Sequence, residues 1–477
     1  MEKTNEKPFK LNYKRTFIIG FAFFGILLLW QVYDSWCPMF LTSLFQNAFH
    51  IEDAKEVQYL VGIMMAIDNL AALILLPIFG HLSDKTKSPI GKRMPYILVG
   101  TFICAVAFPF IPLAMHYNNV AGVLCCMAIV VIFAMMYRNP AVALMPDITP
   151  KPLRSKANGI INIMGYIGGA FATVMGIFFS ATSYFTLVNG KESAYNNIWT
   201  IEVPFIVASV LMLVSALVLF FLIKENKIEE EMKEEMRRGE EYAAIEDKIE
   251  DGKEEAPMSK ANKIMLILIL AAEFFWFMSD NGIGTFMTNY TSWHLHSDTS
   301  KMMIATILGG LASVLGFLFG GTIASKIGRK WTIVTGLGIT VISLLVWTIC
   351  TYTIPISIPE EGTLNSFPIY IYIVWALKGF GMSLVHVNSF PMVVELCSSK
   401  KIGKFTGYYY AASMAAQTVT PILVGSLMLV PTFDFTILPV YGLIMSCAAF
   451  VIFMFVKNVK STKTDFKKGL EALGDDD

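Results

Sequence analysis

Two apolar stretches of this sequence carry the same aromatic and polar side chains at a constant offset of 246 residues. They are Trp30, Asp34, Phe40 and Thr42 in the first stretch and Trp276, Asp280, Phe286 and Thr288 in the second. A carboxylate inside a segment that is apolar enough to span a bilayer costs roughly 2.5 kcal/mol or more, so it normally faces a protein interior or a water-filled cavity. The repeated aspartate therefore predicts a duplicated membrane protein with a polar site at its centre.

Asp34 and Asp68 are the candidates for moving a proton. A proton-coupled carrier needs a carboxylate that is ionised in one state and neutral in another, and burial between apolar neighbours can provide this. The two aspartates lie in the middle of the first and second apolar stretches. We expect one of them to be the proton-coupling site. The alternative is a structural role, in which each compensates the buried charge of Arg138 or Lys378.

Aromatic, amide and basic side chains within the apolar stretches could bind a sugar. The C–H face of a pyranose ring packs against flat aromatic side chains, whereas its hydroxyls need partners such as an amide or the fork of a guanidinium. Because the Trp and Asp of each repeat are one helical turn apart, each pair shares a face. For Arg138 and Lys378, a structural ion pair is the alternative interpretation. The predicted substrate-binding residues are Trp30, Tyr33, Tyr137, Arg138, Trp276, Asp280, Lys378 and Asn388.

Twelve helices are predicted to hold these side chains. Of the 477 residues 55% are hydrophobic and only 16% are charged, and the mean hydropathy is +0.58, which is typical of a polytopic membrane protein. Runs long enough to cross about 30 Å of hydrocarbon occupy 16–44, 57–82, 95–116, 119–145, 157–181, 199–223, 262–291, 302–325, 332–354, 367–396, 405–429 and 435–456. The predicted fold is an all-α membrane protein with twelve transmembrane helices in two six-helix halves related by a parallel repeat.

A charged break divides the twelve runs into two sets of six. The expected domains are an N-terminal half at 1–223, a charged cytoplasmic linker at 224–260, a C-terminal half at 261–456 and a cytoplasmic tail at 457–477. Lys and Arg gather in the two tails and in every second loop, for example 83–94 and 146–156. Because basic loops stay on the cytoplasmic side, we predict a multi-pass protein of the cell membrane with both termini in the cytoplasm.

The first basic loop is predicted to form part of a cytoplasmic gate. Gly80 lets two helices approach closely, and Asp84 can make charge-assisted hydrogen bonds with Lys92 and Arg93 across the cytoplasmic seam. Such bonds must break when a carrier opens inward. The alternative for the two bases is that they only set the topology. The pattern Gly91-Lys92-Arg93 recurs in the second half as Gly328-Arg329-Lys330.

Two acidic residues that close the fourth and tenth apolar runs extend the predicted gate. At an offset of 248 residues, Asp147 corresponds to Glu395. Salt bridges with the nearby Arg154 and Lys404 are expected, and solvated surface charges are the alternative. The predicted gate residues are Gly80, Asp84, Lys92, Arg93, Asp147, Arg154 and Glu395.

These loop residues resemble the signature of a known superfamily. Gly80 to Asp84, followed by Gly91-Lys92-Arg93, is similar to the loop between helices two and three of major facilitator transporters. The spacing of this loop up to Pro95, together with the segment from Pro140 to Pro152, resembles the sucrose-type disaccharide/proton symporters and the glycoside-pentoside-hexuronide/cation symporters. The resemblance covers both halves and implies a twelve-helix carrier that works by alternating access.

One departure from that pattern leaves the substrate open. Plant sucrose carriers place an arginine five residues before the acidic residue that closes helix four, whereas Val142 stands there in this chain and the arginine is Arg138. The prediction is a secondary active transporter, a sugar or glycoside/proton symporter with a disaccharide as the favoured substrate, monomeric in the lipid bilayer. The alternatives are a Na+-coupled symporter, an exporter of a non-sugar solute, or a transporter-derived membrane sensor that signals through the charged linker.

Several other function classes have no signal in the sequence. A Gly-rich phosphate loop ending in Gly-Lys-Ser/Thr is absent, so the chain is not its own ATP-driven pump. No His, Cys and Glu cluster has metal-ligand spacing, no nucleophile elbow occurs, and the seven cysteines are interpreted as buried thiols. We therefore predict that the chain is not an enzyme, and expect no cofactor, no metal and no nucleic-acid partner. Asn289-Tyr-Thr291 is interpreted as a chance match to an N-glycosylation acceptor.

Overall fold

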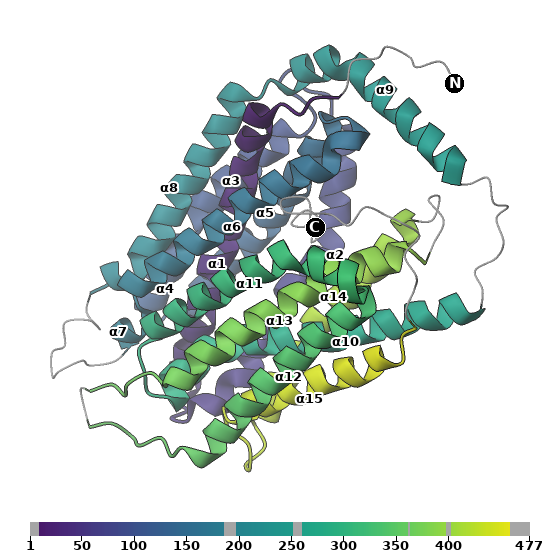
Figure 1. Ribbon diagram of the computed structural model, residues 1–477. Coiled ribbons are helices and arrows are strands. Elements are labelled where there is room, and N and C mark those ends of the chain that lie inside the picture. Colours follow the sequence, from purple (N-terminus) through teal and green to yellow (C-terminus); the bar gives the residue numbers. More distant parts are fainter. Residues whose placement is uncertain (1–8, 186–196, 251–259, 361–362, 397–401, 458–477) are drawn as a thin grey trace.

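The fold is all-α in the part of the chain that the computed structural model describes, which comprises residues 9–185, 197–250, 260–360, 363–396 and 402–457 (Figure 1). Eleven of the described helices are long and apolar enough to cross a membrane. A twelfth, α14 (Ile402–Leu427), has the required length but is less apolar because Gln417, Thr418 and Thr420 lie within it. The predicted fold class is confirmed, with twelve transmembrane helices in two six-helix halves.

In the first half, proline residues interrupt one span and the hydrogen-bond ladder of another. Its helices are α1 (Tyr13–Phe49), α2 (Gln58–Lys85), α3 (Met94–Ala107), α4 (Phe110–His116), α5 (Val120–Asp147), α6 (Arg154–Phe178), α7 (Ala181–Phe185) and α8 (Trp199–Leu222), with short turns η1 (Ala54–Val57) and η2 (Lys151–Leu153). α3 and α4 form one span that is interrupted at Pro109, a residue without an N–H to donate. Within α1, Pro38 likewise cannot donate to the carbonyl of Asp34, so the helical hydrogen-bond ladder is open beside that carboxylate.

The second half repeats this arrangement. Its helices are α10 (Lys260–Asn289), α11 (Thr299–Ile327), α12 (Arg329–Thr353), α13 (Ile369–Val394), α14 and α15 (Ile437–Met454), and a π-helical turn, η3 (Tyr290–His294), continues α10. In the first half α1 packs against α6 and α8, and in the second half α10 packs against α14 and α15. The halves meet where α2 packs against α14, α6 against α11, and α1 against α10.

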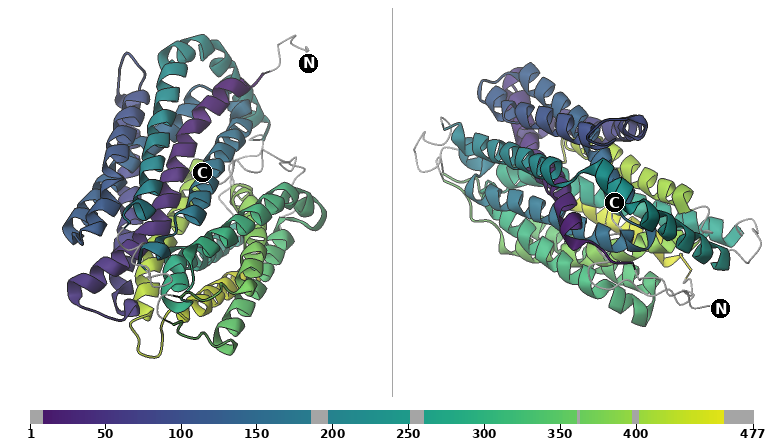
Figure 2. Two further views of the ribbon diagram at one scale, coloured as in Figure 1. Left: turned by 90° about the vertical axis from the view of Figure 1, so that its left-hand side faces the viewer. Right: turned by 90° about the horizontal axis from the view of Figure 1, so that it is seen from above.

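The charged segment between the halves contains a further helix, α9 (Glu225–Glu250), at the same end of the bundle as the start of α1 (Figures 1 and 2). This helix packs on the first half. A Cβ atom at Gly239 would lie 3.1 Å from Pro150 Cβ, and Arg15 at the start of α1 reaches Met232 Sδ at 3.5 Å. We call this end of the bundle the α9 end and the opposite end the distal end.

Candidate functional site

The central polar residues Asp34 and Asp280 lie close to the points on α1 and α10 beyond which a continuous stretch of side chains is buried. Along α1, accessible or partly accessible side chains recur from Phe17 near the α9 end to Asp34, which is exposed, and residues 35–42 beyond it are all buried. Along α10 they recur from Ile267 to Gly284, and residues 285–291 are all buried. Because an exposed carboxylate halfway along a spanning helix would be costly in lipid, we infer that these positions line a water-filled space. The burial pattern implies that this space opens toward the α9 end and is closed toward the distal end.

Asp34 and Asp68, the predicted proton-coupling residues, lie together in the first half. Asp68 on α2 is within electrostatic range of Asp34 and of the Tyr33 hydroxyl. Neither aspartate forms a salt bridge with another residue of the described ranges. The Tyr33 hydroxyl lies beside the Asp68 carboxylate. No basic side chain in the described part of the chain neutralises the carboxylates of Asp34 and Asp68, so these carboxylates are available to a proton or to a ligand.

In the second half, Asp280 on α10 forms an ion pair with Lys378 on α13. The Lys378 side chain is 14% exposed and that of Asp280 is 43% exposed, so the pair borders the water-filled space. The structure therefore brings two predicted substrate-binding residues together, and it gives Lys378 a partner other than Asp34 or Asp68. Arg138 on α5 forms no salt bridge with any residue that the structure describes.

The aromatic members of the repeat differ in exposure. Trp30 is partly exposed one turn before Asp34, and its ring meets that of Tyr33 edge-on with the centroids 5.6 Å apart. Trp276, its counterpart, is 0% exposed and packs near Phe453, with ring centroids 6.4 Å apart, in the core of the second half. In this state the first half alone presents the repeated tryptophan to the water-filled space.

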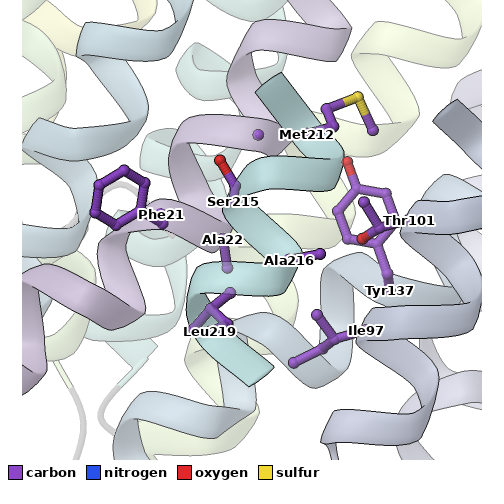
Figure 3. A pocket seen from close by; sticks show the side chains of 10 residues that line it. Phe21, Ala22, Ile97, Thr101, Tyr137, Met212, Ser215, Ala216 and Leu219 are labelled. Atoms are coloured by element: carbon purple, nitrogen blue, oxygen red, sulfur yellow. The ribbon is translucent and has the colours of Figure 1, made fainter. Parts of the chain in front are cut away.

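Tyr137 and Asn388 are also buried. The Asn388 amide donates to the Leu384 carbonyl at 2.9 Å, one turn back along α13. Tyr137 borders a cavity of about 10 Å³ inside the first half, together with Thr101 and Ser215 (Figure 3). The Tyr137 hydroxyl has no hydrogen-bond partner, and a cavity of this size holds about one water molecule. Neither residue reaches the water-filled space in this state.

Arg93 is the centre of a charged cluster at the α9 end. Its guanidinium pairs with Asp84 at the end of α2, donates to the Ser83 hydroxyl, and donates through Nε to Asp147 Oδ2 on α5 at 2.8 Å. Lys92 Nζ lies 3.2 Å from the same Asp147 oxygen. Burial works against the charge of Arg93, but hydrogen bonds and charges from Asp147 and Asp84 hold its pKa above the ordinary value.

This cluster pairs Asp84 with Arg93, one of its two expected partners, while Lys92 pairs with Asp147. It ties α2, α3 and α5 of the first half to one another. The reason is that α2 and α5 both end beside the start of α3. Gly80 permits this packing, since a Cβ atom there would lie 2.4 Å from Asn139 Nδ2 on α5.

Arg154 and Glu395 have partners that were not predicted. Arg154 donates to the carbonyls of Pro146 and Thr149 at 2.9 and 3.1 Å, so it closes the turn between α5 and α6. Arg329 Nε at the start of α12 lies 3.1 Å from Glu395 Oε1, where Lys404 was the expected base. The repeat contained this signal, because Gly328-Arg329-Lys330 matches Gly91-Lys92-Arg93 and Glu395 matches Asp147.

Glu225, the first residue of α9, is a further residue that sequence reasoning missed. Its carboxylate accepts the backbone N–H groups of Lys92, Arg93 and Met94 at 3.0 to 3.1 Å, which are donors that the start of α3 leaves free. Glu225 is 1% exposed, and burial raises its pKa above the ordinary value although these N–H groups oppose the rise. Gly91, at φ 116°, completes the fit because a Cβ atom there would lie 2.0 Å from Glu225 Oε2.

Comparison with known proteins gives one family and a shared fold. The profile of the Major Facilitator Superfamily matches residues 3–173, 60–353 and 265–474. The inward open conformation of the xylose transporter XylE from E. coli is similar, with a TM-score of 0.64 and 16% identity over 97% of this chain and 98% of that chain. The POT family transporter PepTSo has a TM-score of 0.64 and 13% identity over 94% of this chain and 97% of that chain. At such identities these structures share the fold alone, and no curated protein sequence matches the chain.

The matches to the family profile follow the internal duplication. The segment 3–173 falls in the first six-helix half and the segment 265–474 starts in the second, while 60–353 crosses both. Together they extend over almost the whole sequence. The chain therefore belongs to the Major Facilitator Superfamily and is a transporter, not an enzyme.

Proposed function

We propose that the protein is a secondary active transporter that moves a sugar or glycoside, with a disaccharide as the favoured substrate, together with a proton by alternating access. The observation that carries this proposal is the exposed, unpaired carboxylate of Asp34 where the accessible positions of α1 stop. Trp30 lies one turn away and Asp68 is within electrostatic range. A proton and a ligand that bind at one place change each other's affinity, which is the requirement for coupling.

The residues around the water-filled space support a substrate with many hydroxyls. Trp30 offers an aromatic face, and the Asp280 and Lys378 pair can exchange hydrogen bonds with hydroxyls. The guanidinium of Arg138 on α5, which is partly buried, is a further hydrogen-bond donor. XylE, which shares the fold, is a xylose transporter. Peptide transporters share the fold as well, so a test must compare substrate classes.

Uptake into proteoliposomes tests the substrate and the ion together. The purified protein would be offered labelled mono- and disaccharides and a dipeptide, under an imposed proton or sodium gradient. We expect accumulation of a disaccharide against its own gradient when the proton gradient is directed inward. Accumulation that occurs only under the sodium gradient would assign Na+ as the coupling ion in place of the proton. Failure of every sugar, with movement of the dipeptide or of an amphipathic cation, would overturn the sugar assignment.

Amide variants test the assigned coupling residues. Asp34→Asn and Asp68→Asn keep the shape of the side chain and remove its ionisation, so at least one of them should abolish uphill accumulation while exchange of preloaded substrate persists. Glu52→Gln, which changes an exposed carboxylate at the distal end, is the matched control and should accumulate substrate normally. Normal accumulation by both aspartate variants would place coupling elsewhere.

We also propose the orientation and the division of the chain. The two termini and the α9 end face the cytoplasm, and the linker at 224–260 separates the halves at 1–223 and 261–456. A sensor and a carrier respond differently to deletion of part of 228–256, which leaves Glu225 in place. A carrier keeps its uptake, whereas a sensor loses its output while still binding its ligand.

A further inference from the structure

A buried polar cluster joins the two halves at the distal end. The amide nitrogen of Asn289, the last residue of α10, donates to Thr42 Oγ1 on α1 at 2.9 Å and to Gln58 Oε1 at the start of α2 at 2.8 Å. Gln58 Nε2 also donates to Thr42 Oγ1 at 3.2 Å. All three side chains belong to residues that are 0% exposed. We call Thr42, Gln58 and Asn289 the distal lock.

Thr42 and Gln58, the two members of the distal lock in the first half, are each held in place by a hydrogen bond within that half. The Thr42 hydroxyl donates to the Pro38 carbonyl at 2.8 Å, and Gln58 donates to the Ala54 carbonyl at 2.8 Å. Gly425 on α14 packs directly on this site, since a Cβ atom there would lie 2.4 Å from the Gln58 carbonyl oxygen. The hydrogen bonds across the seam therefore form between prepositioned groups in a dry environment, where each is stronger than in water.

The distal lock lies between the water-filled space and the distal face. It stands at the far end of the two buried stretches, 35–42 on α1 and 285–291 on α10. The π-helical turn η3 begins directly after Asn289, and such turns are frequent at functional sites. Asn289 Oδ1 is buried without a partner, so the closed arrangement is not fully satisfied and is less costly to break than a complete network.

A second cluster crosses the seam at the same end but also has a local task. The Ser180 hydroxyl meets the Asp298 carboxylate and the Thr299 hydroxyl, and the Thr299 N–H donates to Thr182 Oγ1 at 3.1 Å. Asp298 also accepts the Ser300 N–H at 2.9 Å and so caps α11. By contrast, the Asn289 amide nitrogen donates to Thr42 and Gln58 of the first half, so it joins the two halves and does not cap its own helix.

We propose that the distal lock is the contact that keeps the central site closed toward the distal face, and that its rupture sets how often the transporter opens there. This rests on the proposed alternating access, in which each opening requires the halves to separate at one end. A two-state equilibrium responds to any group that contributes to one state alone. The seam-crossing bonds of Asn289 exist only when the distal end is closed.

Distances between spin labels across the distal end test this proposal. One label would replace Glu52 in the first half and the other Thr432 in the second, in a background without other reactive cysteines. Both positions are exposed, and their neighbours Asp53 and Asp434 line one hollow at the distal end. A short distance should dominate while the distal lock is intact, and a longer distance should report opening.

Variants of the distal lock should shift these distances. Asn289→Ala is expected to raise the ratio of long to short distances roughly tenfold, the change that a loss of about 1.4 kcal/mol produces. Thr42→Val keeps the shape of the side chain, removes the shared acceptor and should act in the same direction, which keeps the test available if Asn289→Ala folds poorly. Because the two residues share one network, the double variant should shift the ratio by less than the product of the single effects.

Asn47→Ala is the matched control. Asn47 is an amide at the same end of α1, but its hydrogen bond of 2.9 Å runs to Asn118 Oδ1 within the first half, so its loss should leave the distances unchanged. Unchanged distances in Asn289→Ala and Thr42→Val would overturn the proposal, and so would an equal shift in Asn47→Ala. The measurement needs no substrate, so failure of every sugar in the uptake assay would leave its result standing.

Discussion

At the scale of single residues, the two aspartates of the repeat have unequal surroundings. Asp280 is paired with Lys378, whereas Asp34 has no salt-bridge partner in the described part of the chain. A carboxylate whose charge is already compensated exchanges a proton only after its partner is displaced. A carboxylate without a partner responds to protonation directly. We infer that the duplication supplied two equivalent positions, of which Asp34 couples ions and Asp280 shapes the substrate site.

Removing one member of the Asp280 and Lys378 pair should destabilise the fold. Asp280→Asn leaves the Lys378 ammonium, 14% exposed, without its counter-charge, and we expect a loss of about 2 kcal/mol in the free energy of unfolding. The loss is smaller than for a fully buried pair because Asp280 is 43% exposed. The double variant Asp280→Asn/Lys378→Met should recover most of it. Thermal unfolding of the purified proteins measures both, and a single variant as stable as the parent would contradict a structural role for the pair.

Glu273 is a buried acid of α10, and its replacement should stabilise the protein. The residue is 0% exposed and neither carboxyl oxygen has a hydrogen-bond partner. Because an unpartnered buried polar group costs about 1–3 kcal/mol, Glu273→Leu should raise the melting temperature by about 2 °C or more. Glu273→Gln, which retains the polar group, is the control and should not. Loss of coupled uptake in both variants would instead assign the carboxyl a part in transport.

The internal repeat in the sequence was sufficient to predict an accessible helix face with Trp30 and Asp34, but not to predict that Trp276 is buried. Sequence offset gives equivalent positions on equivalent helices, and Asp34 and Asp280 both border the water-filled space as a result. Whether a side chain at such a position is accessible depends on how the whole helix is rotated and on what packs beside it. Trp276 packs near Phe453 of α15, a contact that no local pattern contains.

At the scale of elements, α9 is fixed to the first half through one carboxylate. Glu225 accepts three backbone N–H groups at the start of α3, beside the Arg93 cluster. The Asn226 amide extends the contact by donating to the carbonyls of Ser88 and Pro89 at 3.0 Å. The charged segment is therefore an ordered part of the first half where it begins. A composition rich in Glu and Lys predicts a linker, but it cannot identify which of many carboxylates meets a helix end.

The Glu225 contact should give stability a distinctive pH dependence. Burial raises the pKa of Glu225 above its ordinary value of 4.5, so the folded protein binds this proton more tightly than the unfolded chain does. The contribution of Glu225 to the free energy of unfolding is then largest below about pH 4.5 and falls as the pH rises through the raised pKa. Glu225→Gln does not titrate, so the melting temperature of the parent minus that of this variant should fall as the pH rises.

An exposed carboxylate of the same helix provides the comparison for that experiment. Glu230 on α9 is exposed, so Glu230→Gln is the control for removing a carboxylate from this helix without touching the contact to α3. A melting temperature of the parent minus that of Glu225→Gln that is constant, or that rises with pH, would show that burial does not dominate the titration of Glu225.

At the scale of the whole molecule, the sequence predicted the architecture but not the state. Twelve apolar runs, one charged break and a constant offset are enough to specify two six-helix halves, because hydrocarbon thickness fixes the length of each span. The same halves can meet at either end, and the choice depends on a few contacts between distant segments. Thr42, Gln58 and Asn289 are three such residues, separated by up to 247 positions in the sequence. Polar residues that bind across a seam have no periodicity by which a single sequence reveals them.

The direction in which the central space opens yields a prediction for the whole protein. Gly284 on α10 is exposed, and a Cβ atom there would meet nothing within 4 Å, so Gly284→Cys places a thiol in the water-filled space without disturbing the packing. In vesicles of known orientation, a charged maleimide should label this thiol from the α9 side and not from the distal side. The native thiol of Cys125 is exposed and would be replaced beforehand.

Gly282→Cys is the matched control two residues earlier on the same helix. A Cβ atom at Gly282 would lie 2.9 Å from the Tyr441 ring and 3.1 Å from Thr420, so a thiol there faces packed side chains and should not react. A bound sugar should slow the labelling of Gly284→Cys, because the same space would then be occupied. Labelling of Gly284→Cys from the distal side alone would mean that the space opens the other way. The same labelling can be measured in the Asn289→Ala background. If Gly284→Cys then reacts from the distal side, the water-filled space is connected to the distal lock, since loss of that contact would change the face of the membrane to which the site opens.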